Sequence, residues 1–222
     1  MTRPAAVVFD FNGTVSHDEP LSAELFCEIF REIGVDVSAS LYFAEYAGLS
    51  DREIVASVLD RFGPGDRPDT AASLLARRSR LYLERVTAEP PIRPGAAEAV
   101  RRIAAELPAA IVSGAARHEI EACLEAGGLA GVVDVIVAGE DVREGKPDPE
   151  GYVAALRLLG VDGTDALAFE DSVPGVQAAV AAGLRCIAIS GTAAAERLLA
   201  AGAEAVIPEL DWALPAVRGS IA

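Results

Sequence analysis

Lysine and cysteine are scarce in this chain of 222 residues. The three cysteines, Cys27, Cys123 and Cys186, are odd in number and show no C-x-x-C spacing. This pattern argues against a disulfide framework and gives no sign of a zinc site, so we expect buried, reduced thiols. A single lysine, Lys146, stands beside eighteen arginines.

Positive charge is in short supply throughout, and the formal net charge is -15 at pH 7. A nucleic acid or an anionic membrane surface would be repelled by such a field, so neither is an expected partner. An anionic substrate would need local positive charge. Lys146 is conspicuous for that reason, although a lone lysine is also commonly a solvated surface residue.

Long apolar runs are missing as well. No run approaches the roughly 20 residues of a membrane helix, and the one before Asp10 is too short for a secretory signal. We therefore expect a cytoplasmic protein. With 51% hydrophobic and 24% charged residues, the composition is that of an ordinary globular protein, long enough for a core domain with an inserted subdomain.

The hydrophobic pattern predicts an α/β fold: a doubly wound parallel sheet with a Rossmann-like core and an inserted α-helical subdomain. A proline-rich linker at 89–95 leads from the insert back into alternating strands and helices. The expected strands are 5–11, 109–113, 133–138, 166–170, 184–190 and 205–207. The expected helices are 21–33, 41–47, 51–62 and 70–87 in the insert, then 96–106, 117–126, 149–159, 174–182 and 193–201.

The most informative stretch is Val7-Val8-Phe9-Asp10-Phe11-Asn12-Gly13-Thr14, an apolar strand that delivers Asp10 onto a tight glycine turn. Later apolar runs lead to Ser113, to Lys146 and to the pair Glu170-Asp171. Ligands of an open parallel sheet bind outside the carboxyl ends of its strands, so these residues are expected to converge on one pocket. A nucleophilic carboxylate, a hydroxyl, an ammonium and an acidic pair together indicate phosphoryl transfer.

On these motifs the chain resembles the haloacid dehalogenase superfamily over nearly its whole length, in the subgroup of small-molecule phosphatases and phosphoglucomutase-like enzymes. The family's first motif reads D-x-D-x-T, in which the first aspartate forms an acyl phosphate and the second acts as general acid and base. Asn12 stands at the second position here. An amide cannot exchange protons with a leaving group or with water at neutral pH as a carboxyl group can.

The resemblance implies a role for each matching residue. Asp10 would be the nucleophile, Ser113 and Lys146 would bind the transferring phosphoryl group, and Thr14 and Gly114 would complete the phosphate cradle. A Mg²⁺ ion would be held by Asp10, by the backbone carbonyl of Asn12 and by the acidic pair, with Asp171 a stronger candidate than Glu170. Two of these motifs also have a purely structural explanation. A serine before a helix, such as Ser113, is an ordinary N-cap, and an acidic pair such as Glu170-Asp171 is favourable at the start of a helix.

The same resemblance divides the chain into a core, 1–15 and 89–222, and a cap, 16–88, with hinges near 14–19 and 89–95. In the cap, Gly48-Leu49-Ser50-Asp51-Arg52-Glu53 resembles the loop that meets the substrate, so Arg52 is a candidate substrate-binding residue. Arg117 and His118 are weaker candidates. His17 is a hypothetical proton shuttle in place of the missing acid, or merely a hinge residue.

The function implied is magnesium-dependent hydrolysis of a small phosphate monoester or acyl phosphate through an aspartyl-phosphate at Asp10. A pseudoenzyme that binds phosphorylated ligands is an open alternative, and so is an asparagine introduced to slow catalysis. Mutase chemistry is less expected, because it needs an acid and base where Asn12 stands. Dehalogenation is also less expected, because it needs no metal, whereas Glu170 and Asp171 keep the metal pattern. Phosphonate cleavage is excluded, because it needs a lysine in the cap and the chain has no lysine other than Lys146.

Overall fold

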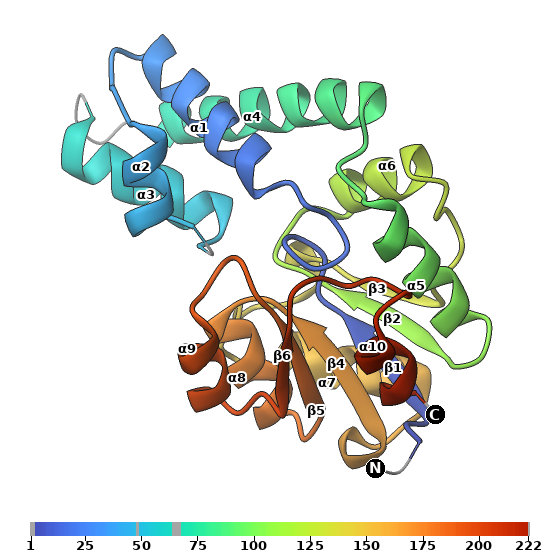
Figure 1. Ribbon diagram of the computed structural model, residues 1–222. Coiled ribbons are helices and arrows are strands. Elements are labelled where there is room, and N and C mark those ends of the chain that lie inside the picture. The colour runs from blue at the N-terminus through green and yellow to red at the C-terminus, as the bar shows by residue number, and fades with distance from the viewer. Residues whose placement is uncertain (1–2, 48, 64–67, 222) are drawn as a thin grey trace.

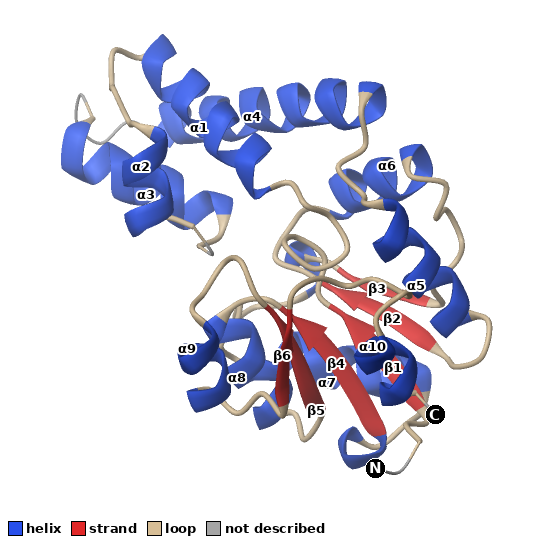
Figure 2. Cartoon of the chain, viewed as in Figure 1, coloured by secondary structure: helices blue, strands red, loops and turns tan. Residues whose placement is uncertain are grey.

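A computed structural model describes residues 3–47, 49–63 and 68–221 of the chain. Six parallel strands of the described residues form one sheet in the order β3-β2-β1-β4-β5-β6 (Figures 1 and 2). The strands are β1 (Ala6–Phe9), β2 (Ala109–Val112), β3 (Val135–Val137), β4 (Ala166–Glu170), β5 (Arg185–Ile189) and β6 (Ala205–Ile207). The predicted fold class is confirmed.

Helices cover both faces of the sheet because consecutive strand residues are buried on opposite sides. Val7 and Phe9 of β1 belong to one apolar cluster, whereas Val8 between them belongs to the other. Both faces therefore lie under apolar helices, as is usual for parallel sheets. One face packs against α5 (Pro94–Ala104), α6 (Arg117–Ala126) and α10 (Pro215–Ser220), the other against α7 (Glu150–Leu159), α8 (Val173–Ala181) and α9 (Ala195–Ala200).

The sequence analysis missed α10, because its six residues are too few for a helical period to stand out. The short 3-10 turns at Gly139–Asp141 and Gly163–Asp165 were not predicted either.

Among the described residues, four helices separate β1 from α5 and form a helical insertion that lies beyond one end of the sheet, at the top of Figure 1. All four predicted helices of the insert appear, with ends within two residues of those expected. Gly48, named in the predicted substrate loop, and residues 64–67 of the insert lie outside the described residues. The helices are α1 (Glu19–Glu32), α2 (Ala39–Glu45), α3 (Asp51–Phe62) and α4 (Pro68–Ala88).

Local sequence signals account for several of these boundaries. Ser50 forms a capping box with Glu53 at the start of α3, each side chain bonding the other's backbone amide. Ser172 caps α8 by accepting from the amide of Gly175. The amphipathic α4 then packs against both α1 and α6, which joins the insertion to the core. The division into 1–15 with 89–222 and 16–88 remains our proposal.

The central strand β1 pairs with β2 on one side and β4 on the other. The strand order reverses direction at this point, which is where open α/β sheets form a crevice for ligands. The carboxyl ends of β1, β2 and β4 lead into Asp10, Ser113 and Asp171 respectively. None of the helices in the described part of the chain combines the length and apolar character needed to cross a bilayer.

Candidate active site

Three buried carboxylates meet at the switch point of the sheet. Asp10 directly follows β1, Glu170 is the last residue of β4, and Asp171 comes next. One oxygen from each lies within 4.8 Å of the others. Such a group of hard oxygen donors suits a divalent cation such as Mg²⁺, which binds through a few carboxylates and keeps several waters.

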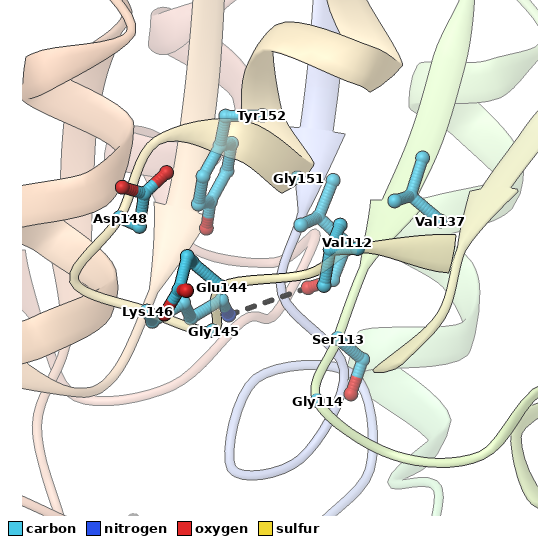
Figure 3. A pocket seen from close by; sticks show the side chains of 11 residues that line it. Val112, Ser113, Gly114, Val137, Glu144, Gly145, Lys146, Asp148, Gly151 and Tyr152 are labelled. Atoms are coloured by element: carbon cyan, nitrogen blue, oxygen red, sulfur yellow. Dashed lines mark hydrogen bonds between the residues drawn. The ribbon is translucent and has the colours of Figure 1, made fainter. Parts of the chain in front are cut away.

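Lys146 joins two of these carboxylates. Its Nζ donates to Asp10 Oδ1 at 2.5 Å and to Glu170 Oε1 at 2.5 Å. It also donates to the backbone carbonyl of Val112 at 3.3 Å, the contact drawn in Figure 3. Tyr152 on α7 donates its hydroxyl to the same Glu170 oxygen at 3.0 Å. The only lysine of the chain is thus the cation of this site.

The electrostatics of the site favour an additional cation. Burial raises the pKa of Asp10 to about 7, with Lys146 opposing the rise and Glu170 adding to it. Burial also raises the pKa of Asp171, and the nearby charges of Asp10 and Glu170 raise it further. In addition, Asp10 Oδ2 is buried without a hydrogen-bond partner. A metal ion would satisfy that oxygen and offset the excess negative charge, so the residues present fit one.

Replacing Lys146 by Met is expected to lower the free energy of unfolding by about 3 kcal/mol at pH 8, because it leaves buried carboxylates without their cation. The loss should be smaller at pH 5, where the carboxyl groups can take up protons. Urea denaturation at both pH values measures this. Lys146→Arg is the charge-preserving control, and equal stability of Lys146→Met and the native chain would contradict the expectation.

Gly13 supplies the turn that brings the next part of the loop past Asp171. Its φ is +86°, and a Cβ at this position would lie 1.9 Å from Asp171 Oδ2. Only glycine has both the conformational freedom and the space. The glycine after Asn12 is therefore required for the close approach of the two loops.

Substitution of Gly13 by Ala is expected to cost about 1–3 kcal/mol of stability from backbone strain, with the displacement of Asp171 in addition. Gly114→Ala is the matched control, because a Cβ there meets no atom within 4 Å. Chemical denaturation of the two variants should separate them clearly. Similar stabilities would show that the loop relaxes freely.

Asn12 lies between two other polar side chains near the carboxylates. Ser113 Oγ donates to Asn12 Oδ1 at 3.0 Å, and Asn12 Nδ2 donates to Asp18 Oδ2 at 2.8 Å. Thr14 is buried, and its hydroxyl has no hydrogen-bond partner. The structure therefore brings Asn12 and Ser113 into direct contact and leaves a free hydroxyl on the loop after β1.

A small cavity of about 30 Å³ lies beside Lys146 and Ser113 (Figure 3). This volume is enough for about one water molecule. Gly114, a predicted phosphate-site residue, is exposed at its edge. The lining residues are Val112, Ser113, Gly114, Val137, Val142, Glu144, Gly145, Lys146, Asp148, Gly151 and Tyr152.

Other candidates from the sequence lie in different surroundings. His17 is exposed, and its Nε2 is 3.0 Å from Arg93 Nη2, whereas the acid bonded to the Asn12 side chain is Asp18. Arg52 is an exposed residue in the first turn of α3. Of the weaker candidates, Arg117 pairs with Asp141 at 2.5 Å, and His118 Nε2 is 2.9 Å from the hydroxyl of Ser79, a residue on α4.

A buried ion-pair cluster between the insertion and the core was missed by the sequence analysis. The guanidinium of Arg78 on α4 contacts Glu119 on α6 and pairs with Asp51 on α3 at 3.3 Å. It also lies 4.6 Å from the centre of the Tyr82 ring. Nothing local marks Arg78 among the neighbouring arginines of α4.

Two further contacts of the carboxylates were also missed. Thr192, in the loop after β5, donates its hydroxyl to Asp171. Tyr152 reaches Glu170 from α7, as described above. Thr192 lies far from the motifs in sequence, and Tyr152 follows the lysine motif on a helix whose orientation the sequence does not give, so only the fold could show that they belong to the site.

Glu19, at the start of α1, is another carboxyl group with a strongly raised pKa. Burial, together with the nearby charge of Asp18, raises its pKa to about 7. The folded chain therefore holds this proton more tightly than the unfolded chain does, so stability should fall as pH rises from about 4.5 through 7.

We expect Glu19→Gln to remove that fall and to be more stable than the native chain by about 2–3 kcal/mol at pH 8, with little difference at pH 4. Denaturation curves at pH 4, 6 and 8 provide the measurement. Glu24→Gln, an exposed change on the same helix, is the control. A constant difference between Glu19→Gln and the native chain across the series would rule out a titrating Glu19.

A doubly wound Rossmann-like sheet with a helical insertion, and with three carboxylates and a lysine at its switch point, is the arrangement of a class of hydrolases. The chain belongs to the haloacid dehalogenase-like hydrolase family, whose profile matches residues 4–183. The resemblance stated from the sequence is thus confirmed.

Individual relatives agree with this assignment. The chain is 30% identical over 193 residues to validoxylamine A 7'-phosphate phosphatase of Streptomyces hygroscopicus subsp. limoneus, a match that covers 86% of this chain and 88% of the relative. It is 33% identical over 196 residues to protein SUPPRESSOR OF QUENCHING 1 of Arabidopsis thaliana, of which the match covers only 18%, against 86% of this chain.

Among solved structures, a variant of CbbY from Rhodobacter sphaeroides in complex with xylulose-(1,5)bisphosphate is similar, with a TM-score of 0.82 and 31% identity. The match covers 93% of this chain and 95% of that one. The insertion and the sheet therefore both have counterparts in a structure that holds a phosphorylated sugar.

Proposed function

We propose that this chain is a magnesium-dependent phosphatase for small phosphorylated metabolites that uses Asp10 as its nucleophile. The observation that carries the proposal is the contact of Asp10 with Lys146 next to the two other buried carboxylates. Structural ion-pair networks also hold buried carboxylates, but this one stands at the switch point of the sheet, where ligands bind.

The chemistry begins with Asp10. One of its carboxylate oxygens attacks phosphorus, the bond from phosphorus to the leaving oxygen breaks, and an aspartyl-phosphate forms. Water then attacks this phosphorus and releases phosphate, which regenerates the carboxylate. Lys146 donates a hydrogen bond to Oδ1 of Asp10 and so orients the carboxylate.

The other residues of the site hold the anionic group. Lys146, the Ser113 hydroxyl, the Thr14 hydroxyl and the loop at Gly114 would bind the phosphoryl oxygens. Asp10, Asp171, Glu170 and the backbone carbonyl of Asn12 would hold a Mg²⁺ ion. When bound, the ion would neutralise negative charge on the transferring group.

Asn12 shapes the choice of substrate. Loss of a general acid typically costs about 10²- to 10⁴-fold, but leaving groups of low basicity need little acid assistance. Acyl phosphates are therefore preferred over simple sugar phosphates in this proposal. Phosphorylated small molecules in general are supported by two relatives, one named for validoxylamine A 7'-phosphate and one crystallised with xylulose-(1,5)bisphosphate.

A protein that binds phosphorylated ligands without turnover is the second candidate. It is favoured by the amide of Asn12, whose oxygen and nitrogen are both engaged by neighbouring side chains and which carries no exchangeable acid proton. The pocket for the phosphoryl group would then be kept and the reaction lost. The substrate-binding residues of the two proposals are the same, so only turnover separates them.

The test is phosphate release from a panel of acetyl phosphate, other acyl phosphates and sugar phosphates, with Mg²⁺ and with EDTA. We expect release that depends on Mg²⁺ and is fastest for acyl phosphates. Binding of inorganic phosphate without any turnover on the panel would favour the second candidate. Release that is the same with EDTA would contradict the metal assignment.

A further inference from the structure

Asp18 is a buried acid that the proposed mechanism does not use. It precedes α1 and has no exposed surface. Its Oδ2 accepts from Asn12 Nδ2 at 2.8 Å and from the Tyr82 hydroxyl at 2.6 Å, while Oδ1 has no hydrogen-bond partner. Burying a carboxylate with one oxygen unpartnered lowers the stability of the fold, so a function for Asp18 beside Asn12 would explain its position.

The contacts of Asn12 form a chain of hydrogen bonds with a defined direction. The amide N–H of Ala115 donates to Ser113 Oγ at 3.1 Å, and Ser113 donates to Asn12 Oδ1. Asn12 Nδ2 then donates to Asp18, as does Tyr82. A backbone N–H can only donate and a carboxylate can only accept. The carboxylate end therefore sets the direction: Asn12 must present Nδ2 to Asp18, which leaves Oδ1 toward Ser113, so the Ser113 hydroxyl donates to it.

This direction determines which way the Asn12 amide faces. Without an acceptor at position 18, nothing on that side would distinguish the oxygen of the amide from its nitrogen. With Asp18 there, Nδ2 is held against the carboxylate and Oδ1 against Ser113. Tyr82 belongs to α4, so the same carboxylate also ties the orientation of Asn12 to the helical insertion.

We propose that Asp18 is a positioning residue for Asn12, holding its amide so that Oδ1 faces Ser113 and coupling that orientation to α4 through Tyr82. Asp18 need not touch the substrate for this. The catalytic consequence rests on the proposed function, whereas the orientation of the amide does not. The two are therefore tested by separate readouts.

The spectroscopic readout uses a feature of the composition. Asn12 is the only asparagine of the chain and Gln177 the only glutamine, so uniformly ¹⁵N-labelled protein contains just two side-chain amide pairs. The Asn12→Asp variant removes one pair and so assigns it. In the native chain we expect the Asn12 pair to show one strongly downfield proton and slow exchange with water.

Asp18→Asn adds a third pair, and comparison with the Asn12→Asp, Asp18→Asn double variant identifies the pair that belongs to Asn12. We expect exchange of that pair to be at least tenfold faster than in the native chain and its downfield proton to move. Tyr82→Phe should speed the exchange of the Asn12 amide protons by a smaller factor. If circular dichroism shows that Asp18→Asn is unfolded, Tyr82→Phe is the variant that tests the proposal. Asp36→Asn, the same chemical change at an exposed site of the insertion, is the control. An unchanged Asn12 pair in the variants that fold would overturn the proposal.

The kinetic readout is a double-mutant cycle on acetyl phosphate. In the native background, Asp18→Asn should lower kcat about tenfold and leave KM within twofold. In the Asn12→Asp background the acceptor at position 12 would face another acceptor, so Asp18→Asn supplies the missing donor and should raise kcat. Equal losses in both backgrounds would indicate a merely structural role and overturn the proposal. Absence of turnover in every variant would refute the proposed function, and the amide spectrum would still decide this inference.

Discussion

Asp10→Asn is expected to reduce phosphate release by about 10⁴-fold or more, the largest effect of any substitution in this account. The amide cannot form the aspartyl-phosphate, and removal of the nucleophile in enzymes with covalent intermediates costs at least this much. Steady-state phosphate release from acetyl phosphate with Mg²⁺ is the measurement.

The control for this experiment is Asp162→Asn, the same change at an exposed position of the core. It should leave turnover and stability as they are. Far-UV circular dichroism of Asp10→Asn will show whether the fold is kept. A folded Asp10→Asn variant with more than a few per cent of native turnover would show that Asp10 is not the nucleophile.

The second large effect is an increase in turnover. Asn12→Asp is expected to raise turnover of sugar phosphates by about 10²-fold or more, because it introduces a carboxyl group able to protonate the leaving oxygen. Acetyl phosphate, whose leaving group needs little assistance, should gain far less. Parallel measurement of kcat on both substrates tests this difference.

Two observations would speak against this explanation of Asn12. Equal gains on the two substrates would show that the substitution acts other than as an acid. A gain of the same size in Gln177→Glu, which makes the matched amide-to-carboxylate change at an exposed position, would show that it acts through overall charge. With Asp18 Oδ2 only 2.8 Å from the Asn12 nitrogen, the new carboxyl group should also show a raised pKa, seen as a shift of the alkaline limb of the pH–rate profile to higher pH.

The sheet was predictable from sequence because its strands are short apolar runs that end in punctuating residues. Strands β4 and β6 and helices α3 and α6 have the predicted limits, because a clear apolar period or a cap such as Ser50 marks them. The limits of β1 were predicted too long. The run from Ala5 to Phe11 is apolar except for Asp10, but the chain leaves the sheet after Phe9 to form the loop at Gly13.

The candidate site was predictable only where function depends on residues in motifs. Asp10, Lys146 and Glu170 could be named from their positions after apolar runs, and the structure brings them within hydrogen-bond or metal-binding distance. Asp18 could not be preferred over His17, its neighbour in sequence. The choice depends on which way each side chain leaves the backbone of a loop, and no periodic pattern records that direction.

The central claim is that Asp10 carries the phosphoryl group during turnover. The most direct measurement is rapid acid quenching of the chain mixed with acetyl phosphate and Mg²⁺, followed by mass spectrometry of its peptides. We expect one phosphoryl group on the peptide that contains Asp10, and none on that peptide in Asp10→Asn. Full turnover with the phosphoryl group on a different peptide, or undiminished turnover by Asp10→Asn, would contradict the account.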